Sequence, residues 1–274
     1  MNNRRWVWWI LLLWCPFSGH AAFERLVTGG RHAGVAGASA ALAGDPWGMF
    51  ANPAGILGLP GCTIVTSVCP SIYGIPELRH LAVSAILPLS WGSIGVAGTT
   101  LGVDGYRETT ASLVIASPLG PAFGCGIRMN SLWLGITSYG STVVPTFDAG
   151  LQARITESFS VGFLLENVTG ARLGIQKEAL PRSVEFGLSI VSSDLGVQAH
   201  ASAVKELSGP LDWRMGVSFT PYECLTLRTG ISTEPALLCG GLGLTVAPVT
   251  LDYAVSHHWQ LGLTHHVSLG FSIE

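Results

Sequence analysis

Apolar and polar side chains alternate along most of the chain after residue 61. In residues 211–220 (LDWRMGVSFT) the odd positions are apolar, whereas the even positions are polar or glycine. The same period of two recurs in residues 158–166, 183–190 and 266–274. Successive side chains of a β-strand point to opposite faces, so this pattern predicts strands that each have one apolar and one polar face.

Turn residues divide this region into about fourteen segments, with breaks at Pro88, Pro221, Pro248 and the run SPLGP at 117–121. A repeat of about 15 residues per strand and turn accommodates the ~9–11 residues with which a β-strand crosses a bilayer. One longer loop is expected at 169–180. We expect strands near residues 61–69, 79–88, 91–101, 107–117, 122–137, 142–154, 158–168, 181–192, 194–205, 211–220, 223–232, 236–246, 248–256 and 264–273.

The apolar set changes parity within residues 121–138. It occupies odd positions up to Met129 and even positions from Leu132 onward. An extra residue in one strand of a pair would produce such a change. The sequence therefore predicts a β-bulge near Asn130–Ser131 or, alternatively, two shorter strands.

Composition separates the two architectures that could use these strands. Apolar residues make up 48% of the 274 residues and charged residues only 11%, against roughly 25% charged in ordinary soluble domains. The polar faces are mostly Gly, Ser and Thr, which suits the lumen of a membrane barrel better than the wet exterior of a sandwich. The predicted lumen-facing charges are Arg128, Asp148, Arg154, Glu166, Glu185, Arg214 and Arg228.

We therefore predict an all-β fold, a transmembrane antiparallel up-and-down β-barrel of about 14 strands, with 12 as the alternative count. Strands in lipid must close on themselves, because open edges would leave backbone groups unpaired. Aromatic residues near the expected strand ends suit the two membrane interfaces. They are Trp91, Tyr106, Trp133, Tyr139, Trp213, Tyr222, Tyr253 and Trp259. A soluble secreted β-sandwich is the alternative.

The N-terminus has the features of a cleaved signal peptide. Arg4 and Arg5 precede the apolar run WVWWILLLW, and Gly19 and Ala21 suit cleavage after residue 21. Residues 1–21 are therefore the expected signal peptide, which indicates export. Removing it leaves 12 basic and 17 acidic residues, a balance that argues against a nucleic-acid partner.

The segment at residues 22–60 shows no alternation and is rich in Gly and Ala. Asp45–Pro46 is a favourable helix start, and Asn52–Pro53 should end that helix after one or two turns. A 14-stranded barrel is wider than its own side chains can fill, so we expect this segment to fold into the lumen as a plug. The candidate plug and ligand residues are Asp45, Trp47, Phe50, Asn52, Pro53 and Gly55.

Two stretches resemble a known family. The first is the run G-x-R-x-x-G-x-x-G-A-x-x-A-x-A-x-D, which begins at Gly29 and ends at Asp45, followed by N-P-A-G at 52–55. The second is LDYAVSHHWQLGLTHHVSLGF at 251–271. Both are similar to FadL-like outer-membrane proteins, most closely to the PorV/PorQ-type branch; the middle of the chain agrees only in its strand pattern.

The resemblance implies a 14-stranded outer-membrane barrel with its N-terminal segment folded into the lumen as a hatch. FadL-like proteins pass long-chain fatty acids and other hydrophobic molecules, whereas PorV-type proteins receive cargo in type IX secretion. This chain is shorter than typical members, so we expect reduced extracellular loops. The expected partners are outer-membrane lipid and either a hydrophobic ligand or a secretion-system protein.

Other candidate chemistry is sparse. His257, His258, His265 and His266 could suggest a metal site, but their spacing does not form a ligand pattern, and we expect no metal. The sequence lacks the G-x-S-x-G, H-E-x-x-H and C-x-x-C motifs and a phosphate loop, so we expect neither an enzyme nor a cofactor. Two hypotheses follow: a barrel that passes or holds a hydrophobic small molecule, and a scaffold or cargo-receiving component without transport activity.

Overall fold

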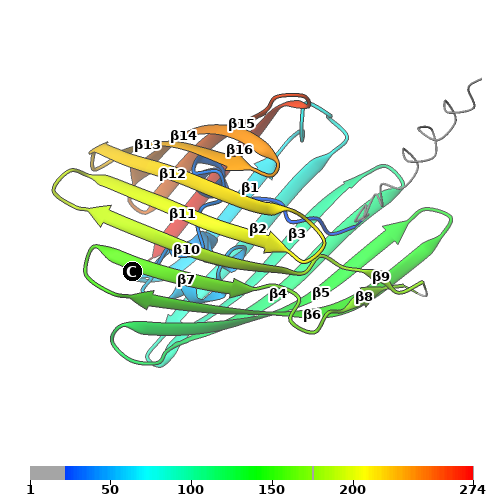
Figure 1. Ribbon diagram of the computed structural model, residues 1–274, viewed down its shortest axis with the longest axis horizontal. Coiled ribbons are helices and arrows are strands. Elements are labelled where there is room, and N and C mark those ends of the chain that lie inside the picture. The colour runs from blue at the N-terminus through cyan, green and yellow to red at the C-terminus, as the bar shows by residue number, and fades with distance from the viewer. Residues whose placement is uncertain (1–21, 175, 274) are drawn as a thin grey trace, which may run out of the picture.

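The computed structural model describes residues 22–174 and 176–273. The expected signal peptide at 1–21 lies outside the described residues. Fourteen antiparallel strands form a closed barrel in which each strand pairs with its neighbours in the sequence, and β1 closes the barrel against β16. Figure 1 shows this continuous wall. The predicted all-β, up-and-down barrel of 14 strands is confirmed.

The strand bounds lie within three residues of the expected ones at every end. Two short strands, β8 (Arg172–Leu173) and β9 (Glu178–Ala179), form a separate hairpin within the expected long loop. The barrel strands are β1 (Cys62–Cys69), β2 (Arg79–Leu89), β3 (Gly92–Val103), β4 (Tyr106–Pro118), β5 (Phe123–Ile136), β6 (Gly140–Arg154), β7 (Phe159–Leu165), β10 (Ser183–Ser192), β11 (Val197–Glu206), β12 (Leu211–Tyr222), β13 (Leu225–Thr233), β14 (Ala236–Val246), β15 (Val249–His258) and β16 (Gly262–Ile273).

The outer face of the wall is apolar and the inner face is polar. In β12, Trp213, Met215, Val217 and Phe219 are exposed, whereas Asp212 and the other residues of its parity face the lumen. Exposed large apolar side chains continue in this way around the barrel. Such a surface suits contact with lipid and would be unfavourable in water. Among the residues that the structure describes, no helix is long and apolar enough to cross a membrane.

The predicted β-bulge near Asn130–Ser131 is wrong. β5 is one continuous strand that keeps its register with both β4 and β6. The parity of the apolar residues changes because Leu132 and Leu134 face the lumen, where they pack with Ala22, Val144, Leu173 and Leu180. An internal apolar cluster therefore produced the signal that suggested a bulge. An irregular register occurs elsewhere, between β12 and β13 at Phe219–Tyr222.

The two ends of the barrel differ. The start of β1 and the end of β16 lie at one end, which we call the turn end; its connections are short. The opposite end, which we call the loop end, carries the two longer connections at 70–78 and 166–182. In Figure 1 the C-terminus marks the turn end, and the hairpin β8–β9 lies at the loop end.

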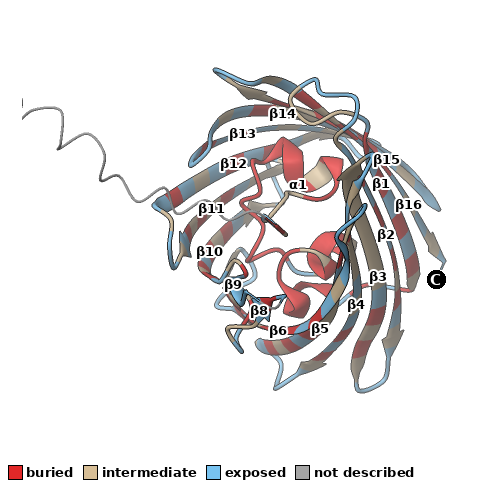
Figure 2. Cartoon of the chain, turned by 90° about the vertical axis from the view of Figure 1, so that its right-hand side faces the viewer, coloured by how far each residue is buried: buried red, intermediate tan, exposed pale blue. Residues whose placement is uncertain are grey.

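The N-terminal segment fills the lumen, as Figure 2 shows. It contains a short α-helix, α1 (Gly30–Gly34), and two 3-10 helices, η2 (Pro46–Met49) and η3 (Pro53–Ile56). α1 packs against β13–β16, and η3 packs against β4–β6. We call residues 22–61 the plug.

The expected single helix at Asp45–Pro46 is instead a pair of 3-10 turns, and α1 was not predicted. Asp45 accepts a hydrogen bond from the Trp47 N–H, and Asn52 accepts one from the Ala54 N–H. Each Asx-Pro pair therefore caps its own turn. Asn52–Pro53 ends the first helical turn, as expected, and also starts a second.

Inward-facing glycines of the wall let the plug approach the strands closely. A Cβ on Gly162 would lie 1.9 Å from the carbonyl oxygen of Ala40, and a Cβ on Gly150 would lie 2.0 Å from Asn52 Oδ1. No real side chain fits at such distances. Part of the glycine content of the polar strand faces is therefore explained by the plug, which packs directly against the backbone of these glycines. The wall glycines that touch it in this way include Gly126, Gly150, Gly162, Gly216 and Gly230.

Candidate functional site

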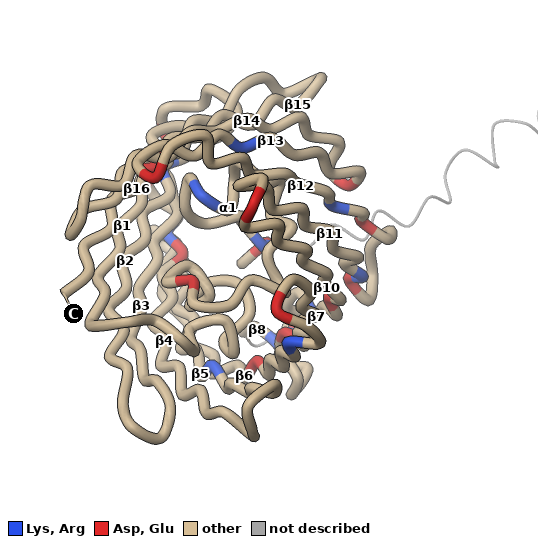
Figure 3. Tube along the Cα trace, turned by 90° about the vertical axis from the view of Figure 1, so that its left-hand side faces the viewer, with Lys and Arg blue, Asp and Glu red and all other residues tan. Residues whose placement is uncertain are grey.

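Six charged side chains of the described wall strands are buried inside the barrel: Glu108, Arg128, Asp148, Glu185, Asp212 and Asp252. Figure 3 marks the charged positions along the chain trace. One group lies on β5, β6 and the residues that follow β7. Arg128 Nε donates a 2.7 Å hydrogen bond to Asp148 Oδ2, and Arg128 Nη2 lies 3.4 Å from Glu166 Oε1. Arg128 and Asp148 are both buried. The structure thus brings together three of the predicted lumen residues.

Arg128 also binds the plug. Its Nη1 donates to the carbonyl oxygens of Met49, at 2.9 Å, and Ala51, at 3.1 Å. Both carbonyls belong to the end of η2 and the turn that follows it. A single guanidinium thus joins two wall carboxylates to the plug backbone. Hydrogen bonds from a charged donor are stronger than neutral ones, so this is a firm attachment.

Arg25 is a lumen residue that sequence reasoning missed. It lies in the extended start of the plug, with its Nε 3.4 Å from Glu166 Oε2 and its Nη2 hydrogen-bonded to Glu185. Glu185, on β10, is fully buried. Nothing in the sequence marked Arg25, because residues 22–28 follow no period and its two partners lie more than a hundred residues away.

Two further ion pairs lie on the opposite wall. Arg214 Nε donates to Asp212 Oδ2, and Arg228 Nη1 donates to Asp252 Oδ1, both at 2.6 Å. The side chain of Arg228 packs beside α1, where a Cβ on Gly34 would lie 3.1 Å from Arg228 Cβ. The carboxylates that neutralise these two arginines were not among the predicted site residues.

Arg154 does not join these groups. It has the inward parity of β6, but it lies at the turn end, where it is exposed and donates a 3.2 Å hydrogen bond to the Pro121 carbonyl. The prediction that it lies inside the lumen is wrong, because β6 extends past the plug and its last residues reach solvent.

The plug has its own charged cluster around Asp45, which is buried. His32 Nε2 lies 2.5 Å from Asp45 Oδ2, and Arg31 Nη1 lies 3.8 Å from Asp45 Oδ1. Burial alone would raise the pKa of this carboxyl, but Arg31 and His32 hold it well below its usual range. The carboxylate therefore stays ionised and ties α1 to the start of η2.

Most of the other predicted plug residues pack the plug and do not line a ligand cavity. A Cβ on Gly29 would overlap the buried Trp47 ring, and one on Gly55 would lie 2.7 Å from the Leu42 carbonyl oxygen. Pro53 packs against Gly126 of the wall. These residues hold the plug compact and seat it on the wall.

Asn52 fixes the plug to itself and to the wall. Its Nδ2 donates to the carbonyls of Ala40, at 2.7 Å, and Leu151, at 3.0 Å. Phe50 is the exception among the predicted plug residues, because it lines a cavity of the lumen.

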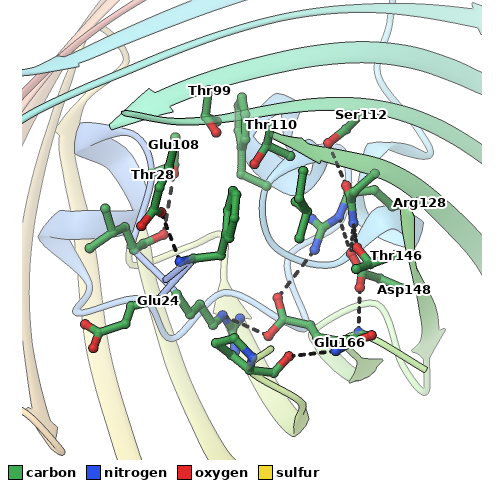
Figure 4. Close-up of a pocket in the computed structure, with 18 of the residues that line it drawn as sticks. Glu24, Thr28, Thr99, Glu108, Thr110, Ser112, Arg128, Thr146, Asp148 and Glu166 are labelled. Atoms are coloured by element: carbon green, nitrogen blue, oxygen red, sulfur yellow. Dashed lines mark hydrogen bonds and ion pairs between the residues drawn. The ribbon is translucent and has the colours of Figure 1, made fainter. Parts of the chain in front are cut away.

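Two of the cavities between the plug and the described part of the wall reach the loop end of the lumen. The first, of about 190 Å³, is lined by charged and hydroxyl groups together with apolar side chains such as Phe23, Phe50 and Leu132. Figure 4 shows hydroxyl groups of Thr99, Thr110 and Ser112 around it, together with the carboxylates of Glu108 and Glu166. We call it the polar chamber. Every charged group of the Arg128 cluster lies on its wall.

The second cavity, of about 100 Å³, is mostly apolar. It lies between the plug and the wall formed by β1, β2 and β12–β16, and the loop at 70–78 covers it through Ile72 and Tyr73. We call it the apolar chamber. The Tyr73 N–H donates to Thr264 Oγ1 at 2.9 Å, which holds the loop down. The apolar lining includes Leu26, Val27, Ala33, Ala36, Leu237 and Cys239.

The four histidines that suggested a metal site do not converge. His257 packs edge-on against Trp259, and His265 accepts or donates a 2.7 Å hydrogen bond with the Tyr253 hydroxyl. His266 faces the lumen and lines the apolar chamber. Within residues 22–174 and 176–273, no three His, Cys, Asp or Glu side chains are grouped so that they could hold a metal ion.

No protein-family model matches the sequence, and no curated protein matches it either. Solved structures share its fold. The toluene transporter TbuX of Ralstonia pickettii is 13% identical over 92% of this chain and 100% of its own, with a TM-score of 0.67. A Pseudomonas aeruginosa FadL homologue is 12% identical over 93% and 100%, with a TM-score of 0.65.

A third structure, the CymD monoaromatic hydrocarbon channel, is 12% identical over 92% of this chain and 99% of its own, with a TM-score of 0.70. At such low identities the likeness shows the fold alone. The resemblance to FadL-like barrels is confirmed at that level, whereas the assignment to the PorV/PorQ-type branch stays a prediction.

Proposed function

We propose that this protein is a bacterial outer-membrane barrel that binds a small apolar molecule in its lumen and passes it across the membrane. The apolar outer wall, the plugged lumen and the fold shared with hydrocarbon transporters support this function. Short turns at one end and longer loops at the other match the periplasmic and extracellular sides of such barrels. The loop end therefore faces outward.

The apolar chamber carries the proposal. The surface of this cavity of about 100 Å³ is mostly apolar, although the Asp212–Arg214 ion pair also borders it. A dry, apolar protein cavity of ~150 Å³ is known to take up benzene. The chamber is smaller than that cavity, so the largest molecule that it suits is one ring or a short chain, of the same class as the hydrocarbons named for the structural neighbours.

The plug must move for the molecule to leave the chamber. Leu26 and Val27 line the chamber from the plug side, and the plug below them packs so tightly on the wall glycines that a Cβ at Gly162, Gly216 or Gly230 would overlap it. A bound molecule thus contacts the same segment that closes the lumen. Binding and opening are coupled if the molecule packs better against a displaced segment.

Toluene binding tests the proposal with a pair of adjacent substitutions. Leu237 lines the apolar chamber, whereas Leu238 faces lipid on the same strand. We expect Leu237→Trp to fill the chamber and weaken toluene binding to the detergent-solubilised barrel at least about tenfold, which corresponds to ~1.4 kcal/mol. Leu238→Trp should leave the affinity unchanged. Equal affinities in the two variants would contradict the proposed site.

The second hypothesis, a scaffold or cargo-receiving component of a secretion machine, stays a prediction. The expectation that the protein is not an enzyme also stays a prediction. Uptake of labelled toluene by cells with and without the protein, beside capture of secreted proteins on the purified barrel, separates the transport and cargo hypotheses.

A further inference from the structure

Glu108 is a buried carboxylate at the loop end of the lumen. It belongs to β4, faces the polar chamber and is 8% exposed. Its Oε2 accepts a 3.0 Å hydrogen bond from the Phe23 N–H, and its Oε1 accepts a 2.5 Å hydrogen bond from the Tyr106 hydroxyl. Tyr106 thus faces inward and does not belong to the aromatic girdle in which the sequence placed it.

Both partners of Glu108 are neutral. Among residues 22–174 and 176–273, the ion pairs within 4.0 Å involve Arg25, Arg31, His32, Arg128, Arg214 and Arg228, and none includes Glu108. The other buried carboxylates, Asp45, Asp148, Asp212, Glu185 and Asp252, each face a basic group. Buried charges in proteins are normally paired. Within the described part of the chain, Glu108 is therefore the one buried carboxylate without a basic partner.

The backbone nitrogen of Ala22 is near enough to supply a cation for Glu108. Ala22 is 7% exposed and packs with Leu132, Leu134, Leu173 and Leu180 at the loop end. The next backbone nitrogen, that of Phe23, already binds Glu108 at 3.0 Å. Consecutive residues are about 3.8 Å apart, so the nitrogen of Ala22 lies at most about 7 Å from the same carboxylate oxygen, a gap that a free chain end closes by rotation about the bonds of residue 22.

We propose that the α-amino group of Ala22, freed by signal-peptide cleavage, forms a buried ion pair with Glu108. Water hydrolyses the Ala21–Ala22 peptide bond: the carbonyl carbon of Ala21 gains a hydroxyl, and the nitrogen of Ala22 becomes an amine that is protonated at neutral pH. The resulting ammonium neutralises Glu108, while Phe23 and Tyr106 keep their hydrogen bonds to it.

The pair gives the plug a further charged anchor, in addition to Arg25 and Arg128. The ion pairs of Arg25 with Glu166 and Glu185 already hold the extended start of the plug against the wall. The ammonium of Ala22 fixes the first residue of the mature chain to β4, at the end opposite the start of β1. The plug is thereby held at the loop end by its terminus and at the turn end by its junction with Cys62. Removal of the signal peptide thus completes the structure of the lumen in addition to releasing the chain.

Amine labelling of the intact protein, purified from outer membranes, tests this pair. We expect mass spectrometry to find Ala22 as the first residue. An unperturbed α-amine has a pKa of ~7.7–8.0, and a neighbouring carboxylate favours its charged form. We therefore expect Glu108→Gln to move the pH midpoint of labelling at Ala22 downward by about one unit, which makes labelling near neutral pH about tenfold faster.

Glu77→Gln is the matched control, because Glu77 is an exposed carboxylate of the loop end that does not line this chamber. It should leave the labelling profile unchanged. Insertion of one alanine after Ala21 gives a second variant that keeps Glu108 and moves the ammonium about 3.3 Å along the chain; its profile should resemble that of Glu108→Gln. A heat-modifiable gel shift verifies folding of each variant. A mature chain that begins at another residue, or identical profiles in the wild type and both altered-pair variants, would overturn the proposal.

Discussion

Arg128 Nη1, in the wall strand β5, donates a 2.9 Å hydrogen bond to the carbonyl oxygen of Met49 in the plug. The same guanidinium binds Asp148 at 2.7 Å. The wall and the plug therefore share one buried charge network, so the plug cannot leave the lumen without exposing or unpairing that network. Substitution of a single wall residue in this network should therefore change how firmly the plug closes the lumen, which conductance measures.

Substituting Arg128 should loosen the plug. Arg128→Met removes the bonds to Met49 and Ala51 and leaves Asp148 buried without its cation, a change that typically costs ~3–5 kcal/mol. We expect a lower free energy of unfolding in urea and a higher single-channel conductance in planar bilayers. Arg154→Met, at the exposed turn end of β6, is the control. It should change the free energy of unfolding by no more than ~0.5 kcal/mol and leave the conductance unchanged. A closed channel in Arg128→Met would show that this residue does not hold the plug.

The glycine seat gives a second, steric test. A Cβ on Gly162 would overlap the Ala40 carbonyl oxygen at 1.9 Å, whereas the nearest atom to a Cβ on Gly240 is 4.0 Å away. We expect Gly162→Ala to displace the plug and cost ~1–3 kcal/mol, as overpacking usually does. Gly240→Ala, on the lipid side of β14, should be neutral. Swelling of liposomes in a small sugar, compared between the two variants, measures the leak; equal rates would mean that the plug is not seated on Gly162.

Asp45 sets the acid resistance of the plug. Burial raises the pKa of this carboxyl, but Arg31 and His32 outweigh burial and lower the pKa below its usual value of ~3.9. Because the pKa in the folded protein lies below that in the unfolded chain, the carboxylate stabilises the fold above ~pH 4, and this contribution is lost only as the pH falls from there toward the folded pKa.

We therefore expect Asp45→Asn to lose ~3 kcal/mol of unfolding free energy, with the same difference from the wild type at pH 7 and pH 5. Urea unfolding in lipid vesicles at the two pH values measures it. Titrating groups that do not contact Asp45 cancel in the difference between variant and wild type, and both proteins carry His32→Gln so that the imidazole beside Asp45 does not titrate between the two pH values. A difference that disappears at pH 5 would contradict the lowered pKa.

The strands could be predicted from the sequence because a period of two is a local signal. It placed every barrel strand end within three residues. The same reasoning failed at Leu132 and Leu134, because a period of two cannot tell whether an apolar residue faces lipid or an internal apolar cluster. Asp45–Pro46 and Asn52–Pro53 mark the starts of the two 3-10 helices, because an Asx residue before proline is a favourable helix cap. Only the first pair was interpreted as a helix start.

The candidate site could be predicted only in part. Arg128, Asp148 and Glu185 were assigned to the lumen by their parity, which fixes the side of the wall a residue faces. Their partners could not be assigned, since Arg25 meets Glu185 across 160 positions and the plug follows no period. Glu108 was not singled out and Tyr106 was assigned to the aromatic girdle, because their connection to residue 23 depends on how the chain threads the lumen, which no local pattern encodes.

Deletion of residues 29–58 tests whether the plug closes the barrel. The strand pairs of the wall are independent of this segment, because β1 closes directly against β16. We therefore expect the shortened protein to insert and to keep its heat-modifiable gel shift. The lumen, however, should conduct, since the removed residues contain α1, η2 and η3. Small sugars should enter liposomes through it several-fold faster than through the wild type, and Leu238→Trp serves as the closed control. If the deletion folded and inserted but conducted no better than the intact protein, residues 29–58 would not be the barrier.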